Sequence, residues 1–150
     1  MAYLSFSSPV GDLTLFEEDG ALVALEWGRA ENGSETPLLR GARRQIDDYF
    51  VGRRRAFDLP LSPAGSPFQR RVWEAMRAIP FGDRRSYGEI AAEIGSAPRA
   101  VGGACGRNPL PILIPCHRVV AANGRLGGYS GEGGAVTKRS LLDLESARRR

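Results

Sequence analysis

Short apolar runs separated by turn residues occupy the start of the chain. Residues 3–6 and 13–16 have a β-type composition, and Pro9-Val10-Gly11 between them is a turn signal. A second turn signal, Asp19-Gly20, leads into the apolar run 21–27. This pattern predicts three strands that are joined by tight turns.

The apolar positions then change to a helical period. In residues 38–50 they recur at Leu38, Leu39, Ala42, Ile46 and Phe50. This spacing is typical of a helix with one buried face. The polar stretch 28–36 predicts a loop, and the basic and then proline-rich stretch after the helix predicts a connector. We therefore expect an N-terminal α/β support lobe at residues 1–58 and a connector at 59–65.

The next stretch carries the end signals of three helices. Ser66-Pro67 is a cap followed by a proline at the first helical position, and Ser86 begins a capping box. Gly95 is a C-terminal stop, and Pro98 opens a third helix that ends near Arg107. Two short helices joined by a tight glycine-containing turn form a helix-turn-helix, which is a common DNA-docking unit.

The chain changes character again after Asn108. Residues 112–114 are apolar and bounded by prolines, which predicts a short buried strand. Residues 123–134 are rich in glycine and predict a loop, and residues 136–145 predict a final helix whose inward-packing residues are Leu141, Leu142 and Leu144. The expected fold class is α/β (α+β), with the small sheet-helix lobe followed by a mainly helical domain at 66–150.

Composition and charge narrow the possible functions. The formal net charge is +4 and the sequence pI is about 9.6, a balance that suits a polyanionic partner. No apolar run approaches the roughly 20 residues that a membrane-spanning helix needs, and the N-terminus lacks a signal-peptide pattern. Two cysteines and one histidine are too few for a four-ligand zinc site. We expect a soluble cytoplasmic protein with no metal and no membrane association.

The only histidine of the chain, His117, directly follows Cys116. A thiolate is a strong nucleophile, and an imidazole nearby can take the thiol proton directly or through a water. Adjacent residues on an extended chain point to opposite sides, which favours a bridging water. The pair alone is also compatible with a small core cysteine beside a core histidine. Cys105 has no acid-base partner nearby in sequence and is interpreted as a packing residue.

The residues around this pair resemble a known family. Pro115-Cys116-His117-Arg118-Val119 is similar to the core signature of the O6-alkylguanine-DNA alkyltransferases, also called methylated-DNA–protein-cysteine methyltransferases. The helix from Phe68, the segment Ser86-Tyr87-Gly88-Glu89 and the final helix are similar to the family in the same order. The resemblance covers residues 66–146, whereas residues 1–58 carry no signature.

The resemblance implies a set of catalytic residues. Cys116 would accept the alkyl group, His117 would take its proton through a water, and Glu145 would hold the imidazole. Asn108 would brace the turn that brings the cysteine to the helices. Tyr87 would help donate a proton to guanine as it leaves, and Lys138 would support that step.

The resemblance also implies a DNA-binding surface. Arg99 would insert into the duplex where the damaged nucleotide leaves the stack, and the helix behind it would enter the minor groove. The other expected DNA contacts are Ala100, Gly102, Gly103, Arg107, Arg118 and Tyr87. The residues implied to line the base pocket are Val119, Tyr129 and Ser130.

The implied function is DNA repair by direct reversal of damage. A methyl or larger alkyl group would pass irreversibly from O6-alkylguanine, and from O4-alkylthymine, in double-stranded DNA to Cys116 of a monomeric protein without a cofactor. A non-enzymatic alkyltransferase-like lesion-binding protein is the main alternative, but that subgroup lacks the acceptor cysteine. A helix-turn-helix regulator and an unrelated thiol enzyme are further alternatives, and neither accounts for both the cysteine and the DNA-docking pattern.

Overall fold

The structure is a computed structural model that describes residues 1–31, 33–127 and 134–148. It divides into two compact units, Met1–Ala64 and Gly65–Arg150. Within the described residues, no helix is both long enough and apolar enough to cross a membrane.

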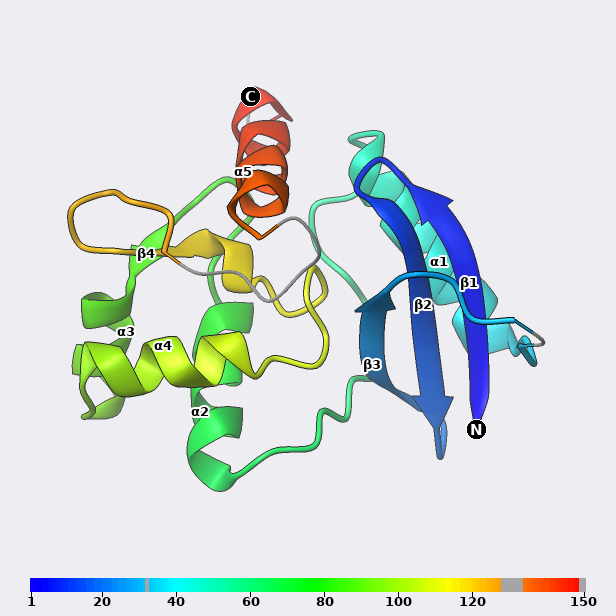
Figure 1. Ribbon diagram of the computed structural model, residues 1–150, viewed down its shortest axis with the longest axis horizontal. Helices are drawn as coiled ribbons and strands as arrows, with labels where there is room; N and C mark the ends of the chain where they lie inside the picture. Colours follow the sequence, from blue (N-terminus) through cyan, green and yellow to red (C-terminus); the bar gives the residue numbers. More distant parts are fainter. Residues whose placement is uncertain (32, 128–133, 149–150) are drawn as a thin grey trace. The chain divides into compact units, whose positions relative to one another are not determined.

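The N-terminal unit is built on a three-stranded antiparallel sheet in the order β1-β2-β3 (Figure 1). Its strands are β1 (Ala2–Ser8), β2 (Gly11–Glu18) and β3 (Ala21–Trp27), as the sequence pattern predicts. Leu4 pairs with Leu15, and Leu15 pairs with Leu25, so that buried leucines form a row across the sheet.

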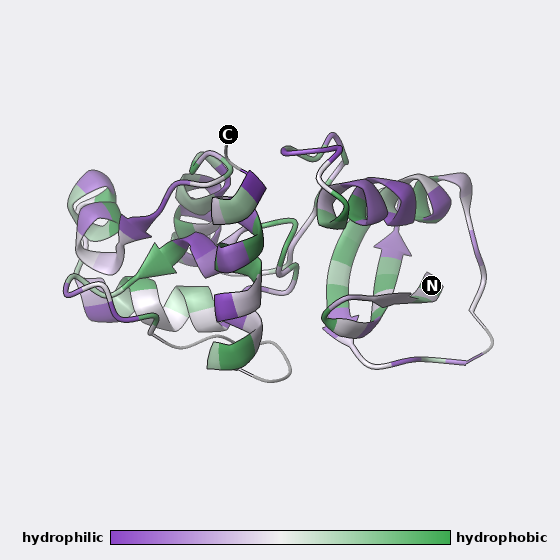
Figure 2. Cartoon of the chain, turned by 90° about the horizontal axis from the view of Figure 1, so that it is seen from above, coloured by the Kyte–Doolittle hydropathy of each residue, from purple (hydrophilic) through white to green (hydrophobic). Residues whose placement is uncertain are grey.

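Helix α1 (Pro37–Phe50) covers one face of this sheet. Thr36 caps it by accepting a hydrogen bond from the Leu39 amide at 3.1 Å. Its inward side chains include Leu39, Ala42 and Ile46, which are fully buried. Figure 2 shows α1 lying across strands whose residues are largely hydrophobic. The predicted helix is therefore confirmed, with Pro37 at its first turn.

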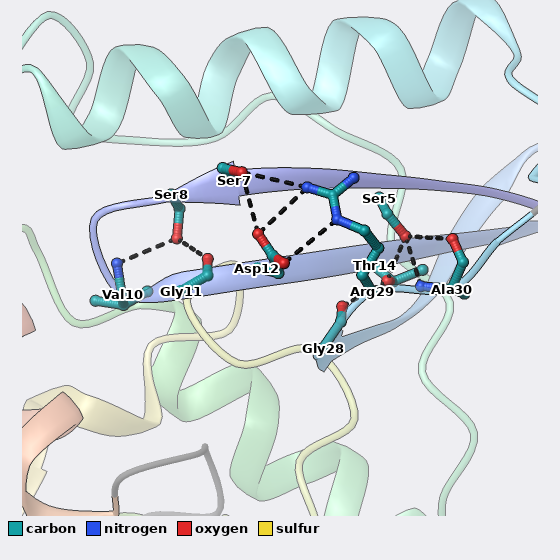
Figure 3. Close-up of polar contacts among 10 residues, drawn as sticks. All are labelled: Ser5, Ser7, Ser8, Val10, Gly11, Asp12, Thr14, Gly28, Arg29 and Ala30. Atoms are coloured by element: carbon teal, nitrogen blue, oxygen red, sulfur yellow. Dashed lines mark hydrogen bonds and ion pairs between the residues drawn. The ribbon is translucent and has the colours of Figure 1, made fainter.

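The loop that follows β3 is fixed to the sheet by polar contacts (Figure 3). Ser5 accepts a hydrogen bond from the Ala30 amide at 2.9 Å and donates to the Ala30 carbonyl at 3.0 Å. The Arg29 guanidinium contacts both carboxylate oxygens of Asp12 at 3.2 and 3.3 Å. Because this ion pair is exposed, it contributes little to stability and serves mainly to hold the loop in register.

Residues of the expected connector extend the sheet. The Leu22 amide donates to the Pro60 carbonyl at 2.9 Å, and the Ser62 amide donates to the Leu22 carbonyl at 2.8 Å. The stretch therefore covers backbone groups on the free side of β3, which would otherwise be an exposed sheet edge. The chain passes into the second unit at Gly65.

The C-terminal unit contains α2 (Pro67–Arg77), α3 (Tyr87–Ile94), α4 (Pro98–Gly106) and α5 (Ala135–Arg148). Complete capping boxes start α2 at Ser66 and α3 at Ser86. Gly95 ends α3 with a φ of 71°, a left-handed conformation that favours glycine. The predicted helices are confirmed.

The segment between α4 and α5 places Cys116 inside the C-terminal unit. A 3₁₀ helix, η1 (Cys116–Arg118), leads into β5 (Val119–Val120), which pairs in parallel with β4 (Arg85–Ser86). Figure 1 shows this segment, in yellow, between α5 and the α2–α4 helices. The pairing joins the start of α3 to the residues that follow the cysteine.

Two sequence predictions in this unit are wrong. Residues 112–114 do not form a strand: Ile112 has a φ of 74°, and the chain turns so that the Ile114 amide donates to the Leu110 carbonyl at 2.8 Å. A short apolar run indicates that the residues are buried, but it does not show whether they form a strand or a turn. In α5, Leu144 is only half-buried, because Lys138 and Glu145 occupy inward positions.

Candidate active site

Asn108 holds the turn that precedes the cysteine. Its side-chain amide donates to the Ile114 carbonyl at 2.9 Å, and its side-chain oxygen accepts from the Leu110 amide at 2.9 Å. These two bonds close the turn across which Ile112 adopts its left-handed φ, a conformation that is rare for a β-branched residue. The structure therefore gives Asn108 the bracing position that was expected for it.

Cys116 is the first residue of η1 and is only 4% exposed. Burial raises the pKa of its thiol to about 11, against the opposing effects of a hydrogen bond with Asn108 and of the Lys138 charge. At neutral pH, on the order of one such thiol in ten thousand is ionised. A reaction at this sulfur therefore requires a base that removes the proton.

His117 is fully buried next to the thiol and bonds to α5. Its Nε2 lies 2.6 Å from Oε2 of Glu145. Burial lowers the pKa of His117, although the Glu145 carboxylate acts in the opposite direction. Nδ1 of His117 is buried and has no hydrogen-bond partner among the described residues. The ring is therefore anchored through one nitrogen while the other stays available as an acceptor.

Glu145 remains ionised although it is 1% exposed. Burial alone would raise its pKa, but hydrogen bonds and charge attraction from His117 and Arg118 outweigh burial and leave the pKa below its ordinary value. Because the carboxylate carries no proton, the hydrogen atom between it and the imidazole belongs to Nε2 of His117. This protonation leaves Nδ1 with the lone pair that can accept a proton.

Arg118 departs from its expected contact with DNA. Its guanidinium is buried and contacts both oxygens of Glu145, at 2.9 and 3.1 Å. A further N–H donates to the Ile79 carbonyl at 2.7 Å. The prediction that Arg118 contacts DNA is wrong for this structure, because its donors are directed into the protein rather than toward solvent.

The structure places Tyr87 and Lys138, the residues expected to help guanine leave, next to each other. Lys138 is fully buried, and its Nζ donates a long hydrogen bond of 3.4 Å to the Tyr87 hydroxyl. Burial, together with the negative charge that Cys105 and Cys116 carry when ionised, raises the pKa of Tyr87 to about 12. The phenol therefore keeps its proton at neutral pH and can donate it. Gly127 packs so closely that a Cβ there would lie 2.6 Å from the Tyr87 hydroxyl.

One face of α4 is exposed and has few side-chain atoms. Arg99, Ala100, Gly103 and Arg107 are exposed on it, and Gly102 is half-buried. A Cβ added at Gly103 would meet no atom within 4 Å, so the fold itself does not require glycine there. Glycine in a helix interior is destabilising relative to alanine. Without a side chain at Gly103, the backbone of this exposed face is open to close approach from outside.

The opposite face of α4 is fixed to α2. The indole N–H of Trp73 donates to the Ala104 carbonyl at 2.9 Å in a buried position. The Cys105 thiol lies 3.3 Å from the Met76 sulfur, also buried. This geometry agrees with the interpretation of Cys105 as a packing residue. Sequence reasoning did not identify the Trp73 contact, because its partner is a backbone carbonyl far along the chain.

The expected base pocket is only partly described. Val119 is fully buried in β5, opposite Arg85 of β4. Tyr129 and Ser130 lie outside the described residues. Their roles therefore stay predictions.

Two family models together match most of the chain. Residues 67–147 match the DNA binding domain of 6-O-methylguanine DNA methyltransferase, and residues 1–63 match its ribonuclease-like domain. The chain belongs to the 6-O-methylguanine DNA methyltransferase family. The N-terminal match extends the family assignment to residues 1–58, which carry no signature motif.

Curated relatives within this family align along nearly the whole chain. The constitutive methylated-DNA–protein-cysteine methyltransferase of Bacillus subtilis (strain 168) is 42% identical, with 95% of this chain and 94% of the relative covered. The methylated-DNA–protein-cysteine methyltransferase of Methanosarcina acetivorans is 41% identical, with 98% of this chain and 99% of the relative covered.

A solved methyltransferase structure agrees with the fold. Mycobacterium tuberculosis OGT in complex with DNA is 44% identical to this chain and gives a TM-score of 0.89. The alignment covers 99% of this chain and 94% of that chain. The α+β fold predicted from the sequence is therefore confirmed.

Proposed function

We propose that this methyltransferase repairs DNA by transferring an alkyl group from O6-alkylguanine to its own Cys116. The observation that carries the proposal is the buried arrangement of Cys116, His117 and Glu145 at the start of η1 and on α5. The names of the relatives, which describe transfer from methylated DNA to a protein cysteine, support the same reaction.

The reaction begins with the removal of the thiol proton. Nδ1 of His117 accepts this proton through a bridging water, and the resulting imidazolium is stabilised by the Glu145 carboxylate at Nε2. The Cys116 sulfur then attacks the alkyl carbon, so that a carbon–sulfur bond forms as the bond between carbon and O6 breaks. Guanine leaves with the electron pair of that bond and takes up a proton, which the neighbouring Tyr87 hydroxyl supplies.

The thioether that results is too stable to be hydrolysed. Because no described group is arranged to remove the alkyl group from sulfur, each molecule acts once. O4-alkylthymine offers the same alkyl–oxygen bond and is a second proposed substrate. We further propose that the protein acts as a monomer in the cytoplasm and needs no cofactor.

The buried position of Cys116 requires that the damaged nucleotide leave the duplex. The exposed face of α4 supports this step, since its small residues allow the backbone to approach the floor of the minor groove. Arg99 is exposed at the start of α4 and forms no ion pair with a described residue, so its side chain is available to fill the gap in the base stack. Arg107 is exposed at the other end of the helix, where it can reach phosphates.

The test compares two cysteine variants. We expect Cys116→Ala to bind a duplex with a single O6-methylguanine but to leave the methyl group in the DNA. Cys105→Ala is the matched control, because it removes the other buried thiol of the chain, and we expect it to restore guanine as the unmodified protein does. Methyl removal by Cys116→Ala, or its loss in a folded Cys105→Ala, would contradict the assignment of the acceptor.

A further inference from the structure

The Arg118 guanidinium is one of the most constrained side chains in the C-terminal unit. Its donors contact both oxygens of Glu145 and the Ile79 carbonyl, and its Cζ lies over the Phe81 ring at 5.8 Å from the centroid. A buried ion pair is weak evidence for stability, because the loss of hydration offsets most of the attraction between the charges. The position next to the catalytic histidine therefore calls for a functional explanation.

We propose that Arg118 is a positioning residue of the proton relay, which holds the Glu145 carboxylate so that His117 keeps its proton on Nε2 and presents Nδ1 to the thiol. The inference rests on the proposed function and adds a residue to its mechanism. Its printed hydrogen bonds go to Glu145 and to the Ile79 carbonyl, so it acts on the relay by holding the carboxylate and through its charge.

The hydrogen bonds to Glu145 carry the positional part of the proposal. Oε1 accepts from the Gly82 amide at 3.1 Å and from Nε of Arg118 at 2.9 Å. Oε2 accepts from Nη2 of Arg118 at 3.1 Å and from Nε2 of His117 at 2.6 Å. These bonds supply each oxygen with two donors from the described part of the chain. The carboxylate cannot turn or take a proton without breaking one of these bonds.

The planar guanidinium is suited to this task. Its two parallel N–H groups match the two oxygens of a carboxylate, whereas a lysine ammonium offers a point charge. The remaining N–H binds the Ile79 carbonyl just after α2, so that Arg118 links the carboxylate on α5 to the turn after α2. Arg118 thereby fixes the relay from two sides.

The charge of Arg118 adds an electrostatic part. Three charged side chains act on the His117 ring: Glu145 and Lys138 from α5, and Arg118 from η1; the Cys116 thiol is its neutral neighbour. Glu145 favours the imidazolium, whereas Arg118 and Lys138 oppose it. Burial is the largest influence that lowers the His117 pKa, and the Arg118 charge adds to it against the attraction of Glu145. Both favour a neutral ring, which can accept the thiol proton.

The test uses the fact that His117 is the only histidine of the chain. Nitrogen-15 NMR of the full chain reports the pKa and the protonated nitrogen of this one ring without ambiguity. We compare the unmodified protein with Arg118→Met and Arg118→Lys. The matched control is Arg77→Met, which removes an arginine from an exposed ion pair with Glu74. The rate of methyl transfer from an O6-methylguanine duplex is measured over the same pH range.

In the unmodified protein, we expect neutral His117 to carry its proton on Nε2. We also expect the pKa of the ring to lie below its ordinary value of 6.5. Arg118→Met should raise the His117 pKa and move the acid side of the rate profile upward by about one pH unit, which is about a tenfold lower rate on that side. The His117 pKa and the rate profile of Arg118→Lys should lie between those of the unmodified protein and Arg118→Met. Arg77→Met should match the unmodified protein in both.

An unchanged His117 titration and tautomer in a folded Arg118→Met would overturn the proposal. If that variant does not fold, Arg118→Lys provides the test. A His117 pKa, tautomer and transfer rate identical to those of the unmodified protein would then overturn the requirement for a guanidinium. Failure of the proposed function gives a different result. In that case the unmodified protein removes no methyl group, whereas the NMR titration still measures what Arg118 does to His117.

Discussion

The replacement of Gly103 by alanine should make the protein more stable and a weaker DNA binder. Gly103 lies inside α4 (Pro98–Gly106), and a Cβ there would meet no atom of the described chain within 4 Å. Alanine in a helix interior is favoured over glycine by about 0.5–1 kcal/mol. For a chain of this size, that gain corresponds to a rise in Tm of about 1–4 °C. The methyl group would project from the exposed face of α4 that is proposed to enter the minor groove.

Gly41→Ala is the matched control for this prediction. Gly41 lies inside α1 (Pro37–Phe50), and a Cβ there would also meet no atom of the described chain within 4 Å. The variant should show a similar rise in Tm and leave the Kd for DNA unchanged, because α1 is not part of the proposed DNA-binding surface.

Thermal unfolding and fluorescence anisotropy with a labelled duplex measure the two effects separately. A rise in Tm with a higher Kd for Gly103→Ala, and a rise in Tm alone for Gly41→Ala, is the expected pattern. If Gly103→Ala bound DNA as well as the unmodified protein, the small-residue face of α4 would not be the DNA-contacting face. If it lowered Tm, the assumption of open space around Gly103 would be wrong.

Three further predictions concern the catalytic residues. Asn108→Ala should lower the free energy of unfolding by about 2–4 kcal/mol, because it leaves the buried Leu110 amide without its acceptor and removes the donor to Ile114; an unchanged urea midpoint would refute this. Gly127→Ala should displace the Tyr87 ring and slow methyl transfer, and equal single-turnover rates would argue against the close packing. The free energy of unfolding should fall as the pH drops below about 6.5, and more steeply below about 4.5. Burial lowers the pKa of His117, and the bonds from His117 and Arg118 lower the pKa of Glu145. The unfolded chain therefore binds more protons than the folded chain in this pH range. Urea midpoints that stay constant from pH 7 to pH 4 would contradict this reasoning.

The helices and the three strands of the N-terminal sheet could be predicted because their signals are local, whereas β4 and β5, which are two residues long each, were not predicted. The capping boxes at Ser66 and Ser86 and the left-handed Gly95 mark helix ends within a few residues of sequence. The turn at residues 112–114 has no such signal. Ile112 adopts a positive φ because Asn108 closes the turn around it, a constraint that arises only when the donor and acceptors meet in three dimensions.

The proposed catalytic set rests on the resemblance to a family and stays a prediction. The bonds that organise it join residues far apart in sequence: Gly82 and Glu145 are separated by 63 positions, and Arg118 and Glu145 by 27. Nothing in the local sequence shows that the Arg118 side chain turns inward. The DNA contact that the resemblance implies for Arg118 is therefore wrong, because the structure directs its guanidinium to the Glu145 carboxylate.

The central claim is tested most directly by the mass of the intact protein after reaction with a duplex that carries one O6-methylguanine. The account predicts a gain of one methylene per protein molecule, located on the peptide that contains Cys116, with no further gain when DNA is in excess. An unchanged mass despite tight binding to the lesion, or a methyl group located on Cys105 instead, would contradict it.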